Sequence, residues 1–496
     1  MIDGYNTYLT PNGYTLEPIG HGKYLVAKDN HFQIIAVERS DKKYVITVGK
    51  ETYEIKPELK ELLTKVPTEK QLLEAIESKP NLDIKELFLE LVEHLKINLD
   101  LENEHDYFLV ALFILQSYKK EFLNAYFFLS ADADKGSAKT VLLENISNLA
   151  YRSELVGGTT IASLRDLIST YKGNILVDEI DQISKDLKSE VMGILRKGQR
   201  RGNKIYKQVK NADGDFRPKA FDVSGSHAFV YRGVVEDALR DRSLSIQPKR
   251  SMDNTLPIIN FHKVVVSSSL VVKLFLWRTT NYYLSVKRKS ALVVEVVVVV
   301  AGGEVEERRK KLFDQFTKSF SPETLEYMST LYGRNMELFY VIHSIAKLTG
   351  LPLQEYLEKI FDKKKDEDSF AEDYYYEYMS NALRELYLEL RAYDEAVIPN
   401  KFRLKRGEFT DCLTFPNGEF NVRFTNLLKS QGISNIGSNK RLSLMRQLGF
   451  VKGVNWGKNQ KIGKPYAVPC LIFTKAVKRK LQIDKIEKKE KESKNV

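Results

Sequence analysis

Apolar residues recur at two different spacings in the first quarter of the chain. Over residues 14–55, short apolar runs are separated by Gly, Asn and Asp, which is typical of strands joined by tight turns. From Thr68 onward, apolar residues recur every three or four positions, as in KQLLEAIESKP and IKELFLELVEHLKINL, which predicts helices. We therefore expect a small β-rich domain at residues 1–66 and a helical connector at residues 67–124.

Residues 125–250 alternate between strand-like and helix-like patterns. The apolar runs AYFFLS, NILVDEI and AFDVSG are separated by amphipathic stretches such as KTVLLENISNLA and DLKSEVMGILRKG. Such alternation is typical of α/β folds with a mostly parallel sheet. The pattern predicts that this segment is the α/β core of the protein.

The pattern is less regular after residue 250. Residues 251–370 fit a mostly helical lid or extension, and they include LVVEVVVVVAGG, which Glu295 interrupts and which is too short to cross a membrane. A buried strand and a buried helix both fit this run, and its role stays open. Residues 475–496 mix both signs of charge with few apolar residues, which predicts a disordered basic tail.

Residues 371–474 combine helical patterns with a basic hairpin. One helical pattern closes at NALRELYLELR, a second covers residues 440–450, and the strand-like VKGVNWGKNQKIGKPYAVPCLIF follows. Helices followed by a basic hairpin are typical of a winged helix, whose last helix enters the major groove of duplex DNA. A winged helix that binds protein is the alternative. The predicted duplex contacts are Lys440, Arg441, Arg446, Lys458, Lys461 and Lys464.

The distribution of charge indicates a partner. The 496 residues carry a net charge of +11, and residues 397–496 alone hold 22 Lys and Arg against 7 Asp and Glu. A positive block of this kind indicates a polyanionic partner, most often nucleic acid.

Cys412 and Cys470 lack the spacing of a zinc finger or a disulfide framework, and no segment reaches the roughly 20 apolar residues of a membrane span. We expect a soluble, cytoplasmic protein that has no membrane partner.

A strand, a loop and a helix follow one another around residues 125–150. The strand AYFFLS leads into ADADKGSAKT and then into VLLENISNLA. A phosphate-binding loop needs backbone N–H groups at a helix N-terminus, a Lys for the phosphates and a hydroxyl for Mg²⁺. Ala133 and Ala138 stand where the motif has glycine, so an ordinary helix cap is the alternative. The predicted nucleotide contacts are Gly136, Ser137, Ala138, Lys139 and Thr140.

A second motif lies 39 residues after Lys139, where the apolar run ILV ends in Asp178 and Glu179. At the end of a strand beside a phosphate loop, Asp178 can hold Mg²⁺ together with Thr140, while Glu179 can polarise the attacking water. An exposed pair of acidic residues is the alternative. The order and spacing favour ATP and Mg²⁺ as cofactors and ATP hydrolysis as the reaction.

Further residues fit roles around a γ-phosphate. The segment FDVSGSH ends a predicted strand with polar side chains, so Ser226 or His227 can serve as a γ-phosphate sensor. Arg242, in ALRDRSLSI, can act as an arginine finger that stabilises phosphoryl transfer across a subunit interface. Arg240 is a weaker candidate, and an Arg held in an ordinary salt bridge is the alternative.

The succession of these motifs resembles the AAA+ ATPase module of archaeal plasmid and virus replication proteins, which are related to superfamily 3 helicases. The likeness spans about residues 125–250 and continues in YGRNMELFYVIHSIAKLTG, residues 332–350. It implies a homo-oligomeric ring, a hexamer or similar. The chain departs from the family at Ala133 and Ala138, which replace glycine, and at His227, where relatives often carry Lys. The roles implied are Walker A for Lys139 and Thr140, Walker B for Asp178 and Glu179, arginine finger for Arg242 and second sensor for Arg334.

A β-hairpin is predicted at residues 205–223, because IYKQVK and FRPKAFDV flank the turn NADGD. Hairpins inserted at this point face the central pore in ring helicases that resemble this chain. Tyr206, Lys207 and Lys210 are therefore predicted to meet single-stranded DNA, with Tyr206 able to stack on a base. A solvated basic hairpin is the alternative.

The leading hypothesis is a ring-forming, ATP-driven DNA helicase or translocase for plasmid or virus replication in an archaeal host. A primase site is not expected, because residues 1–66 are too few and lack paired acidic motifs. One alternative is an AAA+ remodeller or origin-melting initiator without processive unwinding. Another is a DNA-binding scaffold that lacks ATPase activity, since a Cβ at Ala133 or Ala138 can crowd the phosphates.

Overall fold

The chain divides into two compact units, Met1–Lys364 and Lys365–Val496, in a computed structural model. The sequence pattern predicts a boundary at residue 370, close to this division. The residues that the structure describes are 2–3, 5–40, 43–56, 65–101, 103–132, 139–156, 160–178, 180, 183–210, 215–231, 236–248, 264, 266–292, 320–331, 334–365, 380–385, 402–404, 407–409, 413–416, 426, 451–458 and 465–473.

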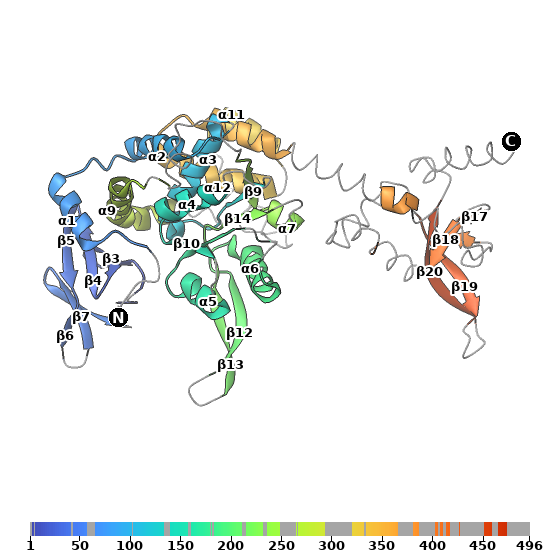
Figure 1. Ribbon diagram of the computed structural model, residues 1–496, viewed down its shortest axis with the longest axis horizontal. Helices are drawn as coiled ribbons and strands as arrows, with labels where there is room; N and C mark the ends of the chain where they lie inside the picture. The colour runs from blue at the N-terminus through green and yellow to red at the C-terminus, as the bar shows by residue number, and fades with distance from the viewer. Residues whose placement is uncertain are drawn as a thin grey trace, which may run out of the picture. The chain divides into compact units, whose positions relative to one another are not determined.

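The N-terminal residues form two four-stranded sheets, with the orders β1-β8-β7-β6 and β2-β3-β4-β5 (Figure 1). Neighbouring strands are antiparallel except β1 and β8, which are parallel. Apolar side chains such as Leu16, Tyr24 and Ile46 form the core of this β domain. The strands are β1 Ile2–Asp3, β2 Tyr8–Leu9, β3 Thr15–Gly20, β4 Lys23–Lys28, β5 His31–Ala36, β6 Glu38–Ser40, β7 Lys43–Val48 and β8 Glu51–Lys56.

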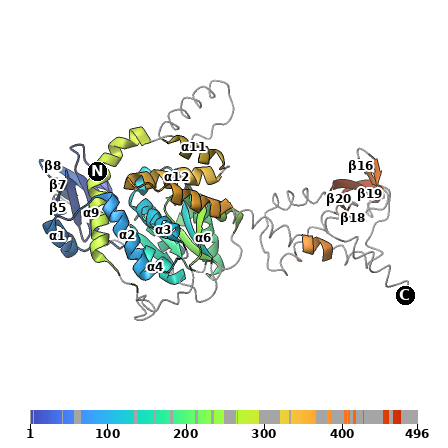
Figure 2. The same cartoon turned by 90° about the horizontal axis from the view of Figure 1, so that it is seen from above.

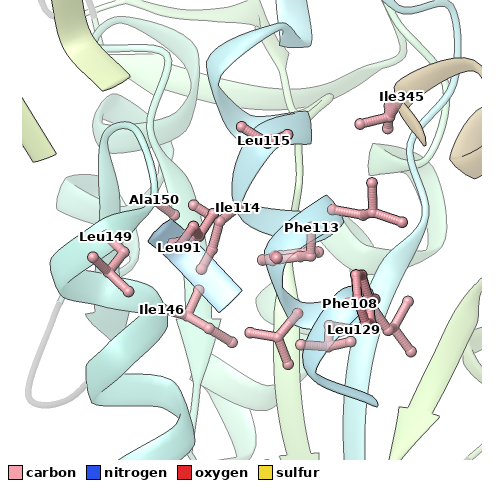
Figure 3. Close-up of a cluster of buried hydrophobic side chains, with 14 of the residues drawn as sticks. Leu91, Phe108, Phe113, Ile114, Leu115, Leu129, Ile146, Leu149, Ala150 and Ile345 are labelled. Carbon is pink, nitrogen blue, oxygen red and sulfur yellow. The ribbon is translucent and has the colours of Figure 1, made fainter. Parts of the chain in front are cut away.

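Three helices follow: α1 Glu69–Ser78, α2 Ile84–Asn98 and α3 Glu104–Tyr118. Helix α1 begins with a capping box, in which Thr68 and Gln71 bond each other's backbone N–H through their side chains. Helix α3 is buried on nearly every side because it is apolar all round. Figure 3 shows the resulting core, where Phe113 and Ile114 of α3 lie near Leu91 of α2, Leu129 and Ile146.

A parallel five-stranded sheet forms the centre of the first unit, with the order β10-β11-β14-β9-β15. Alternate strand residues pack on opposite faces, so that Leu129 and Leu176 join α3 and α4, while Phe128 and Ile175 join α5 and α6. The strands are β9 Phe128–Asp132, β10 Ser153–Val156, β11 Asn174–Val177, β14 Ala228–Tyr231 and β15 Ser243–Ile246, and the helices are η1 Lys120–Phe122, α4 Lys139–Leu149, α5 Ile161–Ser169, α6 Lys185–Gly198 and α7 Asp237–Arg240.

One strand prediction is wrong. The sequence pattern places the run AFDVSG, residues 220–225, in the parallel sheet, but its first residues belong to β13, Phe216–Asp222, which pairs with β12, Lys204–Lys210, in an antiparallel hairpin. The sheet strand is Ala228–Tyr231 instead. The reason is burial, since β13 is exposed from Phe216 to Ala220 whereas a central parallel strand is covered on both faces.

Helix α9, Ser268–Leu292, joins the β domain to the core, because it packs against β3 and β4 as well as α1 and α2 (Figure 2). The described part of the lid also contains α11 Pro322–Ser329, α12 Arg334–Thr349 and a helical segment at 354–365. The Val-rich run after Leu292 lies outside the described residues. None of the helices described is long and apolar enough to cross a membrane.

A buried network of charges also joins the β domain to the core. Arg152, which follows α4, contacts Glu17 of β3 at 3.2 Å. Arg278 of α9 contacts Glu17 at 3.4 Å and Glu121 at 2.8 Å. Both guanidinium groups and Glu17 are almost fully buried, so the pairing with carboxylates is what makes this burial tolerable.

The second unit contains two small antiparallel sheets, β16-β17 and β18-β20-β19. Strands β19 and β20 lie where the basic hairpin is predicted, and Lys458 ends β19. The predicted helix at 440–450 lies outside the described residues, so the winged helix stays a prediction. The strands are β16 Phe402–Leu404, β17 Gly407–Phe409, β18 Leu413–Pro416, β19 Val451–Lys458 and β20 Pro465–Phe473. The remaining predicted duplex contacts lie outside the described residues; they are Lys440, Arg441, Arg446, Lys461 and Lys464.

Candidate nucleotide site and nucleic-acid interface

The predicted phosphate loop connects a central strand to a helix. Strand β9 ends at Asp132 and α4 begins at Lys139, whose side chain is buried. Asp132 therefore lies at the carboxyl ends of the parallel strands, which we call the carboxyl edge and where α/β sheets bind ligands. Gly136, Ser137 and Ala138 belong to residues 133–138, outside the described part.

Thr140 and Asp178 meet at this edge. The Thr140 hydroxyl donates to the Asp178 carboxylate at 2.9 Å, which joins the first turn of α4 to the residue after β11. A hydroxyl and a carboxylate side by side suit Mg²⁺, which keeps few protein ligands and completes its shell with water and phosphate oxygens. Among the described residues, no group of three or more His, Cys, Asp or Glu could hold a metal by itself. Glu179 is not among the described residues.

Ser226 and His227 lie at the opposite edge of the sheet. Both precede β14, so they are at the amino ends of the strands, and the structure does not bring them to Lys139. The His227 ring accepts from the Ile175 N–H at 3.2 Å and donates to the Val223 carbonyl at 3.0 Å. Burial lowers the pKa of His227 to about 4. The sensor role therefore has no geometric support, and the misplaced sensor strand explains the error.

Sequence reasoning missed Tyr231, which lies at the end of the strand that the sheet actually contains. It ends β14 and is paired with Asp132, the last residue of β9, at the carboxyl edge. The signal for this strand is the buried run AFVY, which directly follows the polar segment SGSH. Tyr231 is thus the residue of β14 that lies level with the end of β9 at the carboxyl edge.

Arg242 lies at the amino edge, directly before β15. Its carbonyl accepts from the Phe128 N–H at 3.0 Å, and its guanidinium donates to the Ala238 carbonyl. Burial lowers the pKa of this guanidinium, and nearby Arg334 lowers it further. Arg242 and the start of α4 therefore lie at opposite ends of the same sheet. Arg240, in α7, accepts a hydrogen bond from Lys364 at its carbonyl.

Arg334 lies in the same region as Arg242. It donates to Gln199 at 3.1 Å and to Glu337 at 2.8 Å, and Arg200 binds the same Glu337 carboxylate through two hydrogen bonds. Arg200, Arg242, Arg334 and Glu337 form what we call the arginine cluster. Arg334, the predicted second sensor, therefore lies in the same cluster as Arg242, the predicted finger. The structure does not bring Arg334 to Lys139 of its own chain.

The β12–β13 hairpin projects from the body beyond α5 and α6 (Figure 1). Its register places Tyr206 opposite Ala220 and Phe216 opposite Lys210, so both aromatic residues are on one face. Tyr206 is 70% exposed and Phe216 is 68% exposed. Sequence reasoning missed Phe216, although the antiparallel pairing of the predicted hairpin places it on the same face as Tyr206.

The other face of the hairpin carries cations. Lys207 lies opposite Lys219, and Lys207 contacts Glu190 of α6 at 2.8 Å. Burial alone would raise the pKa of Glu190, but hydrogen bonds from Arg165 and Lys207 outweigh it and lower the pKa. The side chain of Lys210 is not described. Lys207 is therefore anchored at the body of the protein, while Lys219 and Arg217 are exposed.

Comparison with known proteins gives similarity in structure alone. No protein-family model matches the chain, and no curated protein matches it. A JCV helicase structure with a bound small molecule is similar over 53% of this chain and 72% of that chain, at 11% identity and a TM-score of 0.25. A full-length MCM homologue from Methanopyrus kandleri is similar over 70% of this chain and 74% of its own, at 11% identity and a TM-score of 0.31. At this level of likeness, any function has to be argued from the residues above.

Proposed function

We propose that this protein is an ATPase that assembles into a ring and uses ATP hydrolysis to move along DNA and unwind it. The observation that carries the proposal is the hydrogen bond between Thr140 and Asp178 beside the predicted phosphate loop. These residues come from two separate sequence motifs, and they meet where such a loop requires them. The exposed hairpin supplies the feature that suits a nucleic acid.

Each residue of the site has a defined task in this proposal. Lys139 binds the β- and γ-phosphates, while Thr140 and Asp178 hold Mg²⁺, which neutralises the charge that develops on the phosphate oxygens. Glu179 orients the water that attacks the γ-phosphate. Hydrolysis then depends on positioning and electrostatic stabilisation, since the phosphoryl group needs no covalent partner on the protein.

The arginine cluster fits a role toward a neighbouring subunit. Arg242 and Lys139 lie at opposite edges of one sheet, so a single subunit cannot bring them to the same nucleotide. A second copy can present its Arg242 to the phosphates bound by the first. Arg334 lies beside Arg242 and would face the same interface, which is why we propose a ring, a hexamer or similar, as the active form.

The hairpin and the C-terminal unit are the proposed DNA contacts. Tyr206 and Phe216 can stack on bases of a single strand, and Lys219 and Arg217 can meet its phosphates. Lys210 is proposed as a further contact.

The basic residues Lys440, Arg441, Arg446, Lys458, Lys461 and Lys464 are proposed to bind duplex DNA in a winged helix. Replication of a plasmid or virus in an archaeal host is the setting that the sequence resemblance favours.

Turnover of ATP by the purified protein, with and without single-stranded DNA, tests this proposal together with unwinding of a forked duplex. ATP-dependent unwinding supports the helicase. Turnover without unwinding favours the remodeller or origin-melting initiator. Absence of turnover in the wild-type protein, with DNA binding retained, favours the inactive scaffold that Ala133 and Ala138 make conceivable.

A further inference from the structure

The base of the hairpin is bonded to the strand that leads to Asp178. We call residues 223–227 the return segment, because they carry the chain from β13 back to β14. Asn174, the first residue of β11, accepts the Ser226 N–H at 2.9 Å through its side-chain oxygen. The next residue, Ile175, donates its N–H to the His227 ring at 3.2 Å.

The bond from Ile175 replaces a regular sheet contact. Leu176 pairs with Ala228 in the parallel ladder, so Ile175 lies opposite His227, one step before β14 begins. The imidazole accepts the Ile175 N–H through Nδ1, and the other ring nitrogen contacts the Val223 carbonyl. Both bonds require a neutral ring that carries its proton on Nε2.

The return segment packs closely against α6 at Gly198 and against β11 at Gly225. A Cβ on Gly198 would lie 2.7 Å from the Val223 carbonyl oxygen, and a Cβ on Gly225 would lie 2.8 Å from the Asn174 side-chain oxygen. Ser226, His227 and Asn174 are fully buried. A shift of the return segment is therefore passed on to its neighbours, β11 among them, because close-packed interiors transmit displacement.

The opposite end of β11 reaches the candidate nucleotide site. The strand is four residues long, and Asp178 follows it directly and accepts the Thr140 hydroxyl. Strand β11 is also hydrogen-bonded on both sides, to β10 and β14, so it is held as a unit in the sheet. One short strand thus connects the hairpin base to Asp178.

We propose that His227 and Asn174 are positioning residues that couple the hairpin to the nucleotide site through β11. This inference rests on the proposed function, because it describes how binding at one proposed site, the hairpin, affects the other, the nucleotide site. Binding of a DNA strand at the hairpin shifts the return segment, His227 and Asn174 carry the shift to β11, and Asp178 moves relative to Thr140. The reverse transfer follows from thermodynamic linkage.

Two substitutions separate the two bonds of the imidazole. His227→Asn keeps an acceptor near the Nδ1 position for Ile175, whereas His227→Gln keeps a donor near the Nε2 position for Val223. If either variant fails to fold, the other still tests the coupling. The matched control is His94→Gln, since His94 is a buried histidine on α2, outside the sheet.

The first readout is the ratio of ATP turnover with and without single-stranded DNA. The proposal expects basal turnover within about twofold of wild type, while the stimulation ratio falls about fivefold or more, the lower end of typical coupling between sites. His94→Gln should keep the wild-type ratio even if it lowers the melting temperature. An unchanged ratio in both His227 variants, with only a lower melting temperature, would show that His227 is merely structural.

The second readout does not need hydrolysis. The affinity of the protein for ADP is measured with and without a single-stranded oligonucleotide, and the factor between the two values is the coupling. Wild type should show a factor different from one, and the His227 variants should bring it close to one. If the wild-type factor differs from one but wild type does not hydrolyse ATP, the proposed enzyme is overturned and the coupling stands. If the wild-type factor is one, the coupling itself is overturned.

Discussion

Thr140 and Asp178 are 38 residues apart in the sequence and 2.9 Å apart in the structure. One belongs to the first turn of α4 and the other follows β11, so their contact requires the order of the parallel sheet. The contact therefore makes the two sequence motifs parts of one candidate site.

Lys139→Ala should abolish ATP hydrolysis, because Lys139 is the side chain proposed to bind the β- and γ-phosphates. Glu179→Gln should keep ATP binding but lower kcat by about 100-fold or more, since it removes the group that acts on water. Fluorescent-nucleotide binding and phosphate release measure the two effects separately. Undiminished turnover in either variant would contradict the assignment.

Arg242→Ala should lower turnover by roughly a thousandfold, the lower end of what an arginine finger contributes. Because the finger acts on a neighbour's nucleotide, mixtures of the variant with wild type should lose activity faster than the wild-type fraction falls. The control is Arg196→Ala, which removes a half-exposed Arg paired with Glu236. Activity proportional to the wild-type fraction would make Arg242 a local structural residue.

Tyr206→Ala and Phe216→Ala should each weaken binding of single-stranded DNA by about 1–3 kcal/mol if each ring stacks on a base. Tyr206→Phe keeps the ring and should bind like wild type. Fluorescence anisotropy with a short oligonucleotide measures the affinities. Equal affinities for Tyr206→Ala and Tyr206→Phe would place the strand elsewhere.

Replacing Lys440, Arg441, Lys458 and Lys461 by Ala should flatten the dependence of log affinity for duplex DNA on log salt by about 0.9 for each phosphate that the protein no longer neutralises. ATP turnover without DNA should survive. Deletion from Lys475 onward should matter less, because the tail mixes both signs of charge. A salt titration of the three proteins decides. An unchanged slope in the fourfold variant, with a large loss of affinity in the deletion, would move the DNA-binding residues to the tail.

His227 should make folding sensitive to acid. Its pKa is about 4 in the folded protein and about 6.5 in an unfolded chain. Between these values the unfolded chain binds the proton and the folded protein does not, so stability falls as pH falls, by at most about 1.4 kcal/mol per pH unit. Above pH 6.5 this effect is absent.

The measurement is the denaturation midpoint from about pH 7 to about pH 4.5, which brackets most of this window. His227→Gln should flatten the curve below pH 6.5 relative to wild type. His31→Gln is the control, because it removes a histidine at an exposed position of β5. An identical pH dependence in His227→Gln and wild type would show that the buried ring does not resist protonation.

The sequence predicts the parts of the site that depend on local spacing. Strand, loop and helix around Lys139 follow one another directly, and the ILV run determines the position of Asp178. The prediction fails at the sensor strand, because AFDV and AFVY are both apolar runs and only burial in the sheet separates them. The arginine cluster is also beyond the reach of sequence patterns, since Arg200 and Glu337 are 137 residues apart and their contact depends on how the lid packs.

The charge network between the β domain and the core has a consequence for how this chain can be altered or inherited. Glu17 is contributed by the first domain, whereas Arg152 and Arg278 come from later segments. A substitute domain without a carboxylate at that point would leave the buried Arg152 without its carboxylate partner, at about 3–5 kcal/mol, while Arg278 would keep only Glu121. The β domain is therefore not a modular attachment: these three residues have to be exchanged as a set, and recombination between relatives is expected to keep them together.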